Sequence, residues 1–470
     1  MIQNKTKIIC TISDFNCDVE FLKSLYDRGM TAVRINSAHA PVEGAQKIVD
    51  NTRAVSDKIA IFVDTKGPEV RLNKMESEEG FEAKQGDIIY ISNDTEKLAC
   101  QETLHTNCAT IVEDVPVGAH ILIDDGSVEL KVVDKEKDRL VSTVVNSGVI
   151  KGRKSINVPN VRIGLPSLTP KDKVFINWAI DANIDFIAHS FVRSKEDLAE
   201  IQEVLDKRKS HIKIIAKIEN QQGIDNLEEI LHNCSGIMIA RGDLGVEIPP
   251  ERIPIVQRDL VNKCREFRKP VIIATQMLHS MIESPRPTRA EVTDVSNAIF
   301  QRTDAIMLSG ETAAGKYPLQ AVETMSRIAA VSEANMEVVL DELDIEQSHY
   351  LKPIAATLAY NLVKATVQLP VKAIILDTWT GRTGRYIAAF RPKVPIYAMC
   401  YRDFTMRQMA MVYGVFAYRL EIQENKEAMV KRCLEILVNE GRLKKGDLVG
   451  FIGGSFNDEL GASYMEFKYV

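Results

Sequence analysis

Residues 212–245 read IKIIAKIENQQGIDNLEEILHNCSGIMIARGDLG and contain two short runs rich in β-branched residues, at 212–219 and 236–242. Apolar runs of this length are typical of strands that are buried on both faces of a parallel sheet. Each run ends in charged, amide or glycine residues. The stretch therefore predicts parallel strands whose carboxyl ends carry functional groups.

The same pattern recurs through the first two thirds of the chain. Between the runs, residues 19–28 and 196–205 carry apolar residues at helical spacing. Eight such strand–helix units fit a (β/α)8 TIM barrel, although periodicity alone does not exclude an open doubly wound sheet. The other six runs are 7–11, 31–36, 59–64, 185–190, 270–276 and 304–310.

The interval between the third and fourth predicted strands has a different pattern. Residues 86–92, 119–133 and 139–145 alternate and turn as β-hairpins do, and Asp125-Gly126 is a strong signal for a tight turn. We therefore expect an inserted β domain, plausibly a lid, at 68–164. The barrel would then comprise residues 1–67 and 165–340.

The pattern changes again after the barrel. An acidic connector at 341–348 leads to helices and to three expected strands at 371–377, 394–399 and 447–452. These elements predict a third, α/β domain that extends from 341 to 470.

Composition narrows the possible functions. The 470 residues are 45% hydrophobic and 26% charged, which indicates a globular chain and argues against long disorder. The net charge of −6 leaves no overall basic footprint for nucleic acid. The eight cysteines form no CxxC pair, and no apolar run fits a signal peptide or a membrane span. We expect a cytoplasmic protein with no nucleic-acid or membrane partner.

Charged side chains follow several predicted strands. Glu219 and Asp243 could hold one hard divalent cation, with water and substrate oxygens completing its shell. Lys217 lies two residues before Glu219, so both side chains would point the same way. A cation beside such a metal site suits phosphoryl transfer. Arg34 and Arg71 could add fork-shaped contacts to phosphate.

Each of these signals also has an ordinary structural explanation. A Lys-x-Glu pair at a strand end is usually an ion pair. The glycines of 241–245 could seat an anion on backbone amides or merely turn the chain, and Thr275 could be an ordinary loop residue. Six strands nevertheless deliver polar groups to one rim of the predicted barrel. That convergence favours the functional interpretation.

Five segments, in this order, resemble the pyruvate kinase family. The resemblance implies a TIM barrel with an inserted β-barrel lid domain and a C-terminal α/β domain, usually assembled as a homotetramer. It also implies phosphoryl transfer from phosphoenolpyruvate to ADP, giving pyruvate and ATP in glycolysis. The segments are DTKGPEVR (64–71), IIAKIENQQGI (214–224), MIARGDLGVEIP (238–249), ATQML (274–278) and MLSGETAAGKYP (307–318).

The resemblance further implies a role for each matching residue. Glu219 and Asp243 would bind the essential Mg²⁺ or Mn²⁺. Lys217 would stabilise the transferring phosphoryl group and Arg34 would hold the phosphate, while Thr275 would relay a proton to the enolate. The remaining implied positions are Gly242, Asp243, Ser190 and Glu311 for the substrate, and Asn36, His39, Arg71 and Lys154 for the nucleotide.

One departure from the family concerns potassium. The family usually reads RLNFSHG after the second strand, and its serine helps to bind K⁺, whereas this chain reads RINSAHA at 34–40 and has Ala38 there. Ser37 or a water molecule could fill the gap. In the family, a glutamate at the position of Glu69 accompanies K⁺ dependence. We therefore expect K⁺ to activate this protein. The implied K⁺ ligands that remain are Asn36, Asp64 and Thr65.

The C-terminal domain has one candidate binding loop. Residues 378–383, TWTGRT, follow an expected strand, open a helix and resemble the sugar-phosphate effector loop of many pyruvate kinases. Hydroxyls and helix amides make a phosphate site physically reasonable. An ordinary turn with N-capping threonines remains the alternative. The candidate effector residues are Thr378, Thr380, Gly381, Arg382 and Thr383.

Two other hypotheses stay open at this stage. A Mg²⁺-dependent lyase of the phosphoenolpyruvate/pyruvate barrel superfamily would also use Glu and Asp ligands but would need no nucleotide. A catalytically impaired relative could act as a regulatory binding protein, and Ala38 is the one change that favours it. The lid with Lys154 and the DTKGPE segment favour phosphoryl transfer.

Overall fold

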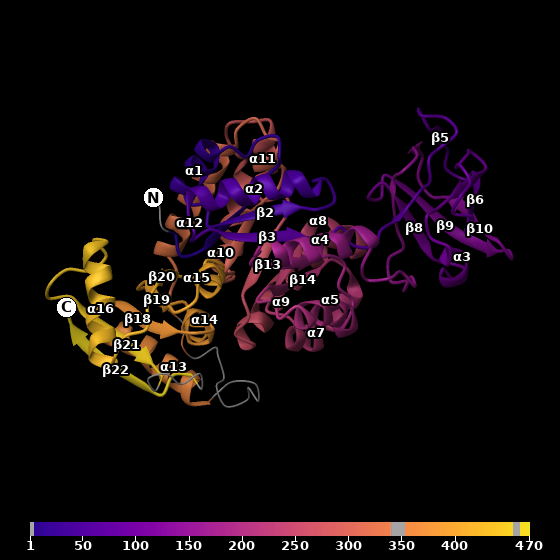
Figure 1. Ribbon diagram of the computed structural model, residues 1–470. Coiled ribbons are helices and arrows are strands. Elements are labelled where there is room, and N and C mark those ends of the chain that lie inside the picture. Colours follow the sequence, from indigo (N-terminus) through magenta and orange to yellow (C-terminus); the bar gives the residue numbers. More distant parts are fainter. Residues whose placement is uncertain (1–3, 339, 341–352, 455–460) are drawn as a thin grey trace.

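A computed structural model describes residues 4–338, 340, 353–454 and 461–470 of the chain (Figure 1). Eight parallel strands close into a barrel in the order β1-β17-β16-β15-β14-β13-β3-β2, which confirms the predicted fold class. The barrel strands are β1 (Lys7–Thr11), β2 (Ala32–Asn36), β3 (Ala60–Asp64), β13 (Phe186–His189), β14 (Lys213–Ile218), β15 (Gly236–Ala240), β16 (Val271–Ala274) and β17 (Ala305–Leu308).

The barrel strands are buried on both faces, which explains their uninterrupted apolar sequences. One set of side chains fills the barrel interior, where the rings of Phe62 and Phe186 stack with centroids 4.4 Å apart. The other set packs against the surrounding helices. These are α1 (Val19–Asp27), α2 (Val42–Val55), α4 (Pro170–Asp181), α5 (Lys195–Lys207), α6 (Gln221–Asp225), α7 (Leu227–Asn233), α8 (Arg241–Glu247), α9 (Ile253–Glu266), α10 (Arg289–Phe300), α11 (Gly310–Ala313) and α12 (Pro318–Ala334), with 3-10 turns η1 (Pro250–Arg252) and η2 (His279–Ile282).

The inserted domain projects from one end of the barrel (Figure 1). Seven of its strands form one sheet in the order β4-β12-β8-β9-β10-β6-β7, and a bridge between Leu72 and Thr106 connects the ends of the first and last strands. The expected turn at Asp125-Gly126 is present, and both residues have positive φ. The elements are β4 (Val70–Arg71), β5 (Phe81–Ala83), β6 (Ile88–Ser92), β7 (Thr103–His105), α3 (Ile111–Asp114), β8 (His120–Ile123), β9 (Val128–Lys135), β10 (Arg139–Val144), β11 (Gly148–Ile150) and β12 (Ser155–Asn157).

The C-terminal domain is a five-stranded sheet in the order β20-β19-β18-β21-β22. Two of these strands, β20 and β22, are absent from the sequence expectation, and the acidic connector at 341–348 lies outside the described residues. The five strands are β18 (Val371–Thr378), β19 (Ile396–Cys400), β20 (Val415–Arg419), β21 (Leu448–Gly453) and β22 (Tyr464–Tyr469). The helices are α13 (Pro353–Gln368), α14 (Arg382–Ala389), α15 (Asp403–Met409) and α16 (Lys426–Asn439).

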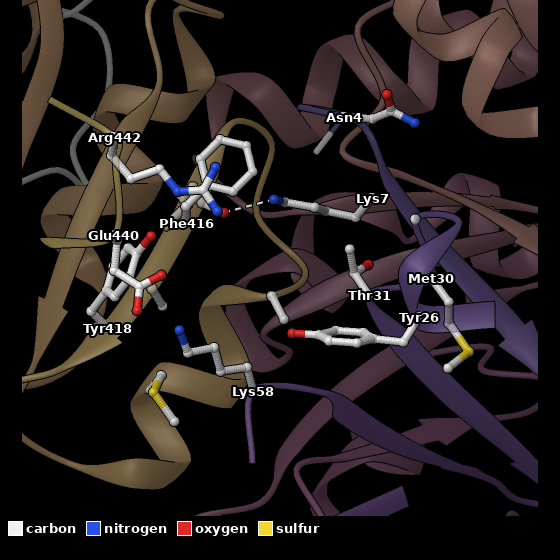
Figure 2. Close-up of a pocket in the computed structure, with 15 residues that line it drawn as sticks. Asn4, Lys7, Tyr26, Met30, Thr31, Lys58, Phe416, Tyr418, Glu440 and Arg442 are labelled. Atoms are coloured by element: carbon white, nitrogen blue, oxygen red, sulfur yellow. Dashed lines mark hydrogen bonds between the residues drawn. The ribbon is translucent and has the colours of Figure 1, made fainter. Parts of the chain in front are cut away.

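Buried polar contacts join the C-terminal domain to the amino-terminal end of the barrel. The fully buried Lys7 donates to the carbonyl of Val415 at 2.6 Å, beside a cavity of about 180 Å³ (Figure 2). Arg407 of α15 donates to Asp185 at 2.5 Å, where β13 begins. The contacts fix the domain against the end of the barrel opposite the lid. Among the described helices, none has the length and apolar character needed to cross a membrane.

Candidate active site

A buried network of four charged side chains lies at the carboxyl ends of β2, β3 and β14. Arg34 donates through Nε to Asp64 Oδ2 at 3.0 Å, and its Nη2 contacts the same oxygen. Lys217 Nζ lies 2.9 Å from Glu219 Oε1 and 3.4 Å from Asp64 Oδ2. The barrel thus brings together, at the carboxyl ends of three strands, residues that are up to 185 positions apart.

Burial and charge together set the protonation of this network. Burial opposes the charge of Lys217, but the carboxylates of Asp64 and Glu219 outweigh it and hold the pKa of Lys217 above its usual value. Burial would raise the pKa of Asp64, yet Arg34 and Lys217 keep it below its usual value. Burial raises the pKa of Glu219, and the ammonium of Lys217 opposes that shift. Lys217 therefore stays cationic at the floor of the site.

A chain of hydrogen bonds positions Lys217 from below. Its ammonium donates to Ser190 Oγ at 2.8 Å, and that hydroxyl donates to the carbonyl of Thr65 at 2.7 Å. The hydroxyl of Thr65 in turn lies 3.1 Å from Nδ1 of His189. Burial lowers the pKa of His189 to about 4, so its ring is neutral near pH 7. The sequence did not single out His189, because the SFVR segment that drew attention begins at its neighbour Ser190.

Thr275 is held in an uncommon backbone conformation beside the helix start at Gly242. Its φ of +69° lies in the left-handed region, which is a genuine outlier for a β-branched residue and is typical of functional sites. The hydroxyl accepts from the amide of Gly242 at 2.7 Å and donates to the carbonyl of Ala274 at 2.6 Å. Arg241 donates to the carbonyl of Thr275 at 2.8 Å and so supports this geometry.

A cleft of about 630 Å³ separates the barrel from the inserted domain. Arg71 and Lys154 line it from the inserted domain, and Asp243 lines it from the barrel. Both cations are engaged with neighbours, Arg71 with Glu69 at 2.7 Å and Lys154 with Asp124 at 2.9 Å. The cleft therefore has two cations, each paired with a carboxylate, on the side of the inserted domain and the carboxylate of Asp243 on the side of the barrel.

Hydrogen bonds also hold the linker that leads from the inserted domain back to the barrel. Arg193 donates to the carbonyls of Ile163 at 3.4 Å and Leu165 at 3.1 Å, and it pairs with Asp197 at 2.9 Å. Arg193 was not predicted as a site residue, although it ends the SFVR segment that contains Ser190. Its contacts indicate that it anchors the hinge of the inserted domain.

The donor sets fit the two expected cations. Within the described residues, no group of three or more His, Cys, Asp or Glu side chains forms a metal cage, so Glu219 and Asp243 could bind a cation only with substrate and water oxygens. That arrangement suits Mg²⁺, which keeps several waters. For K⁺, Asp64 Oδ1 and the fully buried Ser37 Oγ lack hydrogen-bond partners within the described chain. Ser37, the residue before Ala38, therefore has a buried hydroxyl that no described residue engages.

Three other predicted site residues lie outside the network of charged side chains around Lys217. Asn36 Oδ1 accepts from the amide of Ala38 at 3.1 Å, and His39 is exposed and outside the set that lines the cleft. Glu311 is buried, and its carboxylate accepts from the amides of Ser309 at 2.8 Å and Leu278 at 3.2 Å. It connects the loops after β16 and β17. Phe191, which the sequence did not single out, donates its amide to Glu219 Oε2 at 2.7 Å.

The candidate effector loop has the expected strand-to-helix geometry. The amide of Gly381 donates to the hydroxyl of Thr378 at 2.8 Å, and Gly381 has a φ of +74°. Helix α14 begins directly afterwards, at Arg382. Thr378 therefore shapes the turn, while the hydroxyls of Thr380 and Thr383 flank the helix start.

The closed barrel, the inserted domain and the lysine–carboxylate network define the class of protein as a barrel enzyme built for phosphoryl transfer. Two family models match the chain, the pyruvate kinase barrel domain at residues 3–322 and the pyruvate kinase alpha/beta domain at 356–465. The chain belongs to the pyruvate kinase family and is a phosphotransferase.

Individual relatives agree over nearly the whole chain. A pyruvate kinase from Borreliella burgdorferi is 44% identical, covering 100% of this chain and 98% of the relative. One from Geobacillus stearothermophilus is 42% identical over 98% of this chain and 79% of the relative. A crystal structure of a pyruvate kinase from Cryptosporidium parvum superposes with a TM-score of 0.93 at 35% identity, covering 99% of this chain and 96% of that one.

Proposed function

We propose that this chain transfers the phosphoryl group of phosphoenolpyruvate to ADP in the cleft between the barrel and the inserted domain. The observation that carries the proposal is the position of Lys217, fixed by Asp64, Glu219 and Ser190 at the barrel rim. A buried, protonated lysine can neutralise charge that develops on the transferring oxygens. Arg34, largely buried beside it, would supply a second cation for the phosphate.

Mg²⁺ or Mn²⁺ bound by Glu219 and Asp243 would supply Lewis-acid charge to the substrate oxygens. The amides of Gly242 and Asp243 at the start of α8 would seat the substrate carboxylate, since helix amides bind anions well. Ser190 and Glu311 would act on this pocket by positioning Lys217 and the neighbouring loops.

The second chemical step is protonation of the pyruvate enolate. Thr275 Oγ1 accepts from the amide of Gly242 and donates to the carbonyl of Ala274, so its proton is engaged by the backbone in this state. Rotation of the hydroxyl would present that proton to a water molecule beside the enolate. We assign Thr275 to this relay, in keeping with the backbone conformation that holds it there.

ADP would bind on the side of the inserted domain. Lid closure would bring Arg71 and Lys154 onto the nucleotide phosphates and exclude water, with Asn36 and His39 completing that side. Both cations would exchange their present carboxylate partners, Glu69 and Asp124, for phosphate.

We also propose that K⁺ activates the reaction from a site formed by Asp64, the Thr65 carbonyl and Asn36, with Ser37 in place of the absent serine. A homotetramer in the cytoplasm is the proposed physiological form. The loop that contains Thr378, Thr380, Gly381, Arg382 and Thr383 is the proposed site for a phosphorylated effector.

The deciding experiment measures pyruvate formation from phosphoenolpyruvate with ADP, Mg²⁺ and K⁺ each omitted in turn. We expect turnover to require ADP and Mg²⁺ and to rise with K⁺. Ser37→Ala should need more K⁺ for half-maximal rate. Folded protein that forms no pyruvate under any of these conditions would refute the proposal, and pyruvate release from a larger acid without ADP would favour the lyase.

A further inference from the structure

A small pocket with an excess of positive charge lies where the barrel meets the C-terminal domain. Arg268 and Lys269, between α9 and β16, line it from the barrel, and Arg385 of α14 lines it from the C-terminal domain. Its volume is about 10 Å³, which is room for about one water molecule or one phosphoryl oxygen. Lysine and arginine side chains therefore surround a space that only one atom or small group of a ligand could enter.

The single acidic residue among the described residues that line this pocket is already neutralised. Asp304 Oδ2 pairs with Arg391 at 2.9 Å and accepts from the amide of Val271 at 3.2 Å. Its Oδ1 accepts from the amide of Tyr413 at 3.1 Å. Asp304 consequently has little charge left to offer the remaining cations.

Three of the other lining cations contact neutral groups. Lys269 donates to the carbonyl of Cys234 at 2.6 Å, and Arg385 donates to the carbonyl of Thr380 at 3.2 Å. Arg268 lies over the ring of Phe390, with its guanidinium carbon 4.7 Å from the centroid. Within the described part of the chain, none of the three forms an ion pair with a carboxylate.

A fourth cation stands at the rim. Lys213, the exposed first residue of β14, lies near Lys269, because the Cys234 carbonyl that accepts from Lys269 is followed by Ser235, whose amide donates to the carbonyl of Ile214 at 2.8 Å. Burial and Arg382, three residues earlier on α14, lower the pKa of Arg385 to about 10. We call the junction that contains Lys213, Arg268, Lys269 and Arg385 the seam. Like charges held close together in such a partly buried place lower the stability of the fold unless an anion binds between them.

We infer that this seam binds the phosphate group of a small anion, held between Lys213 and Lys269 of the barrel and Arg385 of the C-terminal domain. One phosphoryl oxygen would enter the pocket, and the rest of the group would lie at the exposed mouth beside Lys213. Lysine and arginine in this number suit phosphate, whose several oxygens can meet three cations at once.

The seam is separate from the catalytic cleft. Lys213 begins the strand whose other end carries Lys217, so the two sites lie at opposite ends of the barrel. An anion that contacts both domains would stabilise their association by binding the folded state alone. The inference does not depend on the proposed roles of the cleft residues.

The test compares thermal unfolding of the full chain in increasing inorganic phosphate, with chloride holding ionic strength constant. The variants are Lys269→Met and Lys213→Gln, with Lys173→Gln on the exposed face of α4 as the matched control. We expect phosphate to raise the unfolding temperature of the parent and of Lys173→Gln, and the rise to be lost or much reduced in the two seam variants. Without phosphate, Lys213→Gln should be at least as stable as the parent, because repulsion is removed.

An equal phosphate-dependent rise in all four chains would place the anion elsewhere and overturn the inference, as would no rise in the parent. Because Lys213 is exposed, its variant should fold even if Lys269→Met does not. A parallel series with glycerol 3-phosphate distinguishes the source of the phosphate group. Protection at lower concentration than inorganic phosphate would indicate a phosphorylated metabolite, and weaker protection would indicate free phosphate.

Discussion

Nδ1 of His189 lies 3.1 Å from the hydroxyl of Thr65, directly beneath the groups that hold Lys217. Thr65 Oγ1 also accepts from the amide of Ser190 at 2.9 Å, and the Ser190 hydroxyl accepts from Lys217. A fully buried, neutral histidine thus supports a cation that it does not touch.

Replacing His189 by leucine should lower kcat by roughly 10- to 100-fold, because small misplacements of a catalytic group are costly. The KM for ADP should change little, since the nucleotide side is untouched. His189→Asn, whose side-chain amide can approach Thr65 from a similar position, should recover part of the loss. Steady-state kinetics of the two variants check this, and equal losses in both would indicate a packing role only.

Lys217→Met should lower kcat by at least ~10³-fold, because the variant loses its main charge stabilisation in the transition state. It also leaves Asp64 and Glu219 without their shared cation, so the unfolding temperature should fall. Pyruvate formation and thermal unfolding are measured on the same preparation. Turnover close to that of the parent would remove Lys217 from the mechanism.

Thr275→Ser keeps the hydroxyl that contacts Gly242 and Ala274, whereas Thr275→Val keeps the shape and removes it. We expect the serine variant to retain most of kcat and the valine variant to lose much more. The two variants should differ most in the rate at which solvent protons are incorporated into pyruvate, because that rate reports enolate protonation. Matching losses in both variants would point to packing rather than proton relay.

Lys7 should make stability depend on pH. Burial lowers its pKa from 10.5 to about 8, outweighing the opposing effects of Glu333 and Asp304. Between these two values the unfolded chain binds more protons at this position than the folded chain, so folding becomes more favourable as pH rises. Denaturant unfolding should therefore show the parent gaining stability relative to Lys7→Met from about pH 8 upward. A difference that is flat or falls over that range would contradict the prediction.

Local sequence patterns were sufficient to predict several secondary-structure elements. The eight barrel strands follow from runs that are apolar on both faces, and the turn at Asp125-Gly126 follows from residues that tolerate positive φ. Strands β20 and β22 were missed, because a short strand or one at the sheet edge, such as VFAYR at 415–419, carries little periodicity.

The amino-acid sequence was sufficient to predict the eight strand segments, the order of the motifs and the types of charged group at the strand ends, because burial pattern and chemical type are local properties. The tertiary structure was needed to show that His189 supports Thr65, that no described residue engages the Ser37 hydroxyl, and that Lys213, Lys269 and Arg385 lie close together. These relationships join residues up to 172 positions apart or depend on which neighbours remain after packing. Closure of the barrel and docking of the C-terminal domain set those distances, and no periodicity along the chain encodes them.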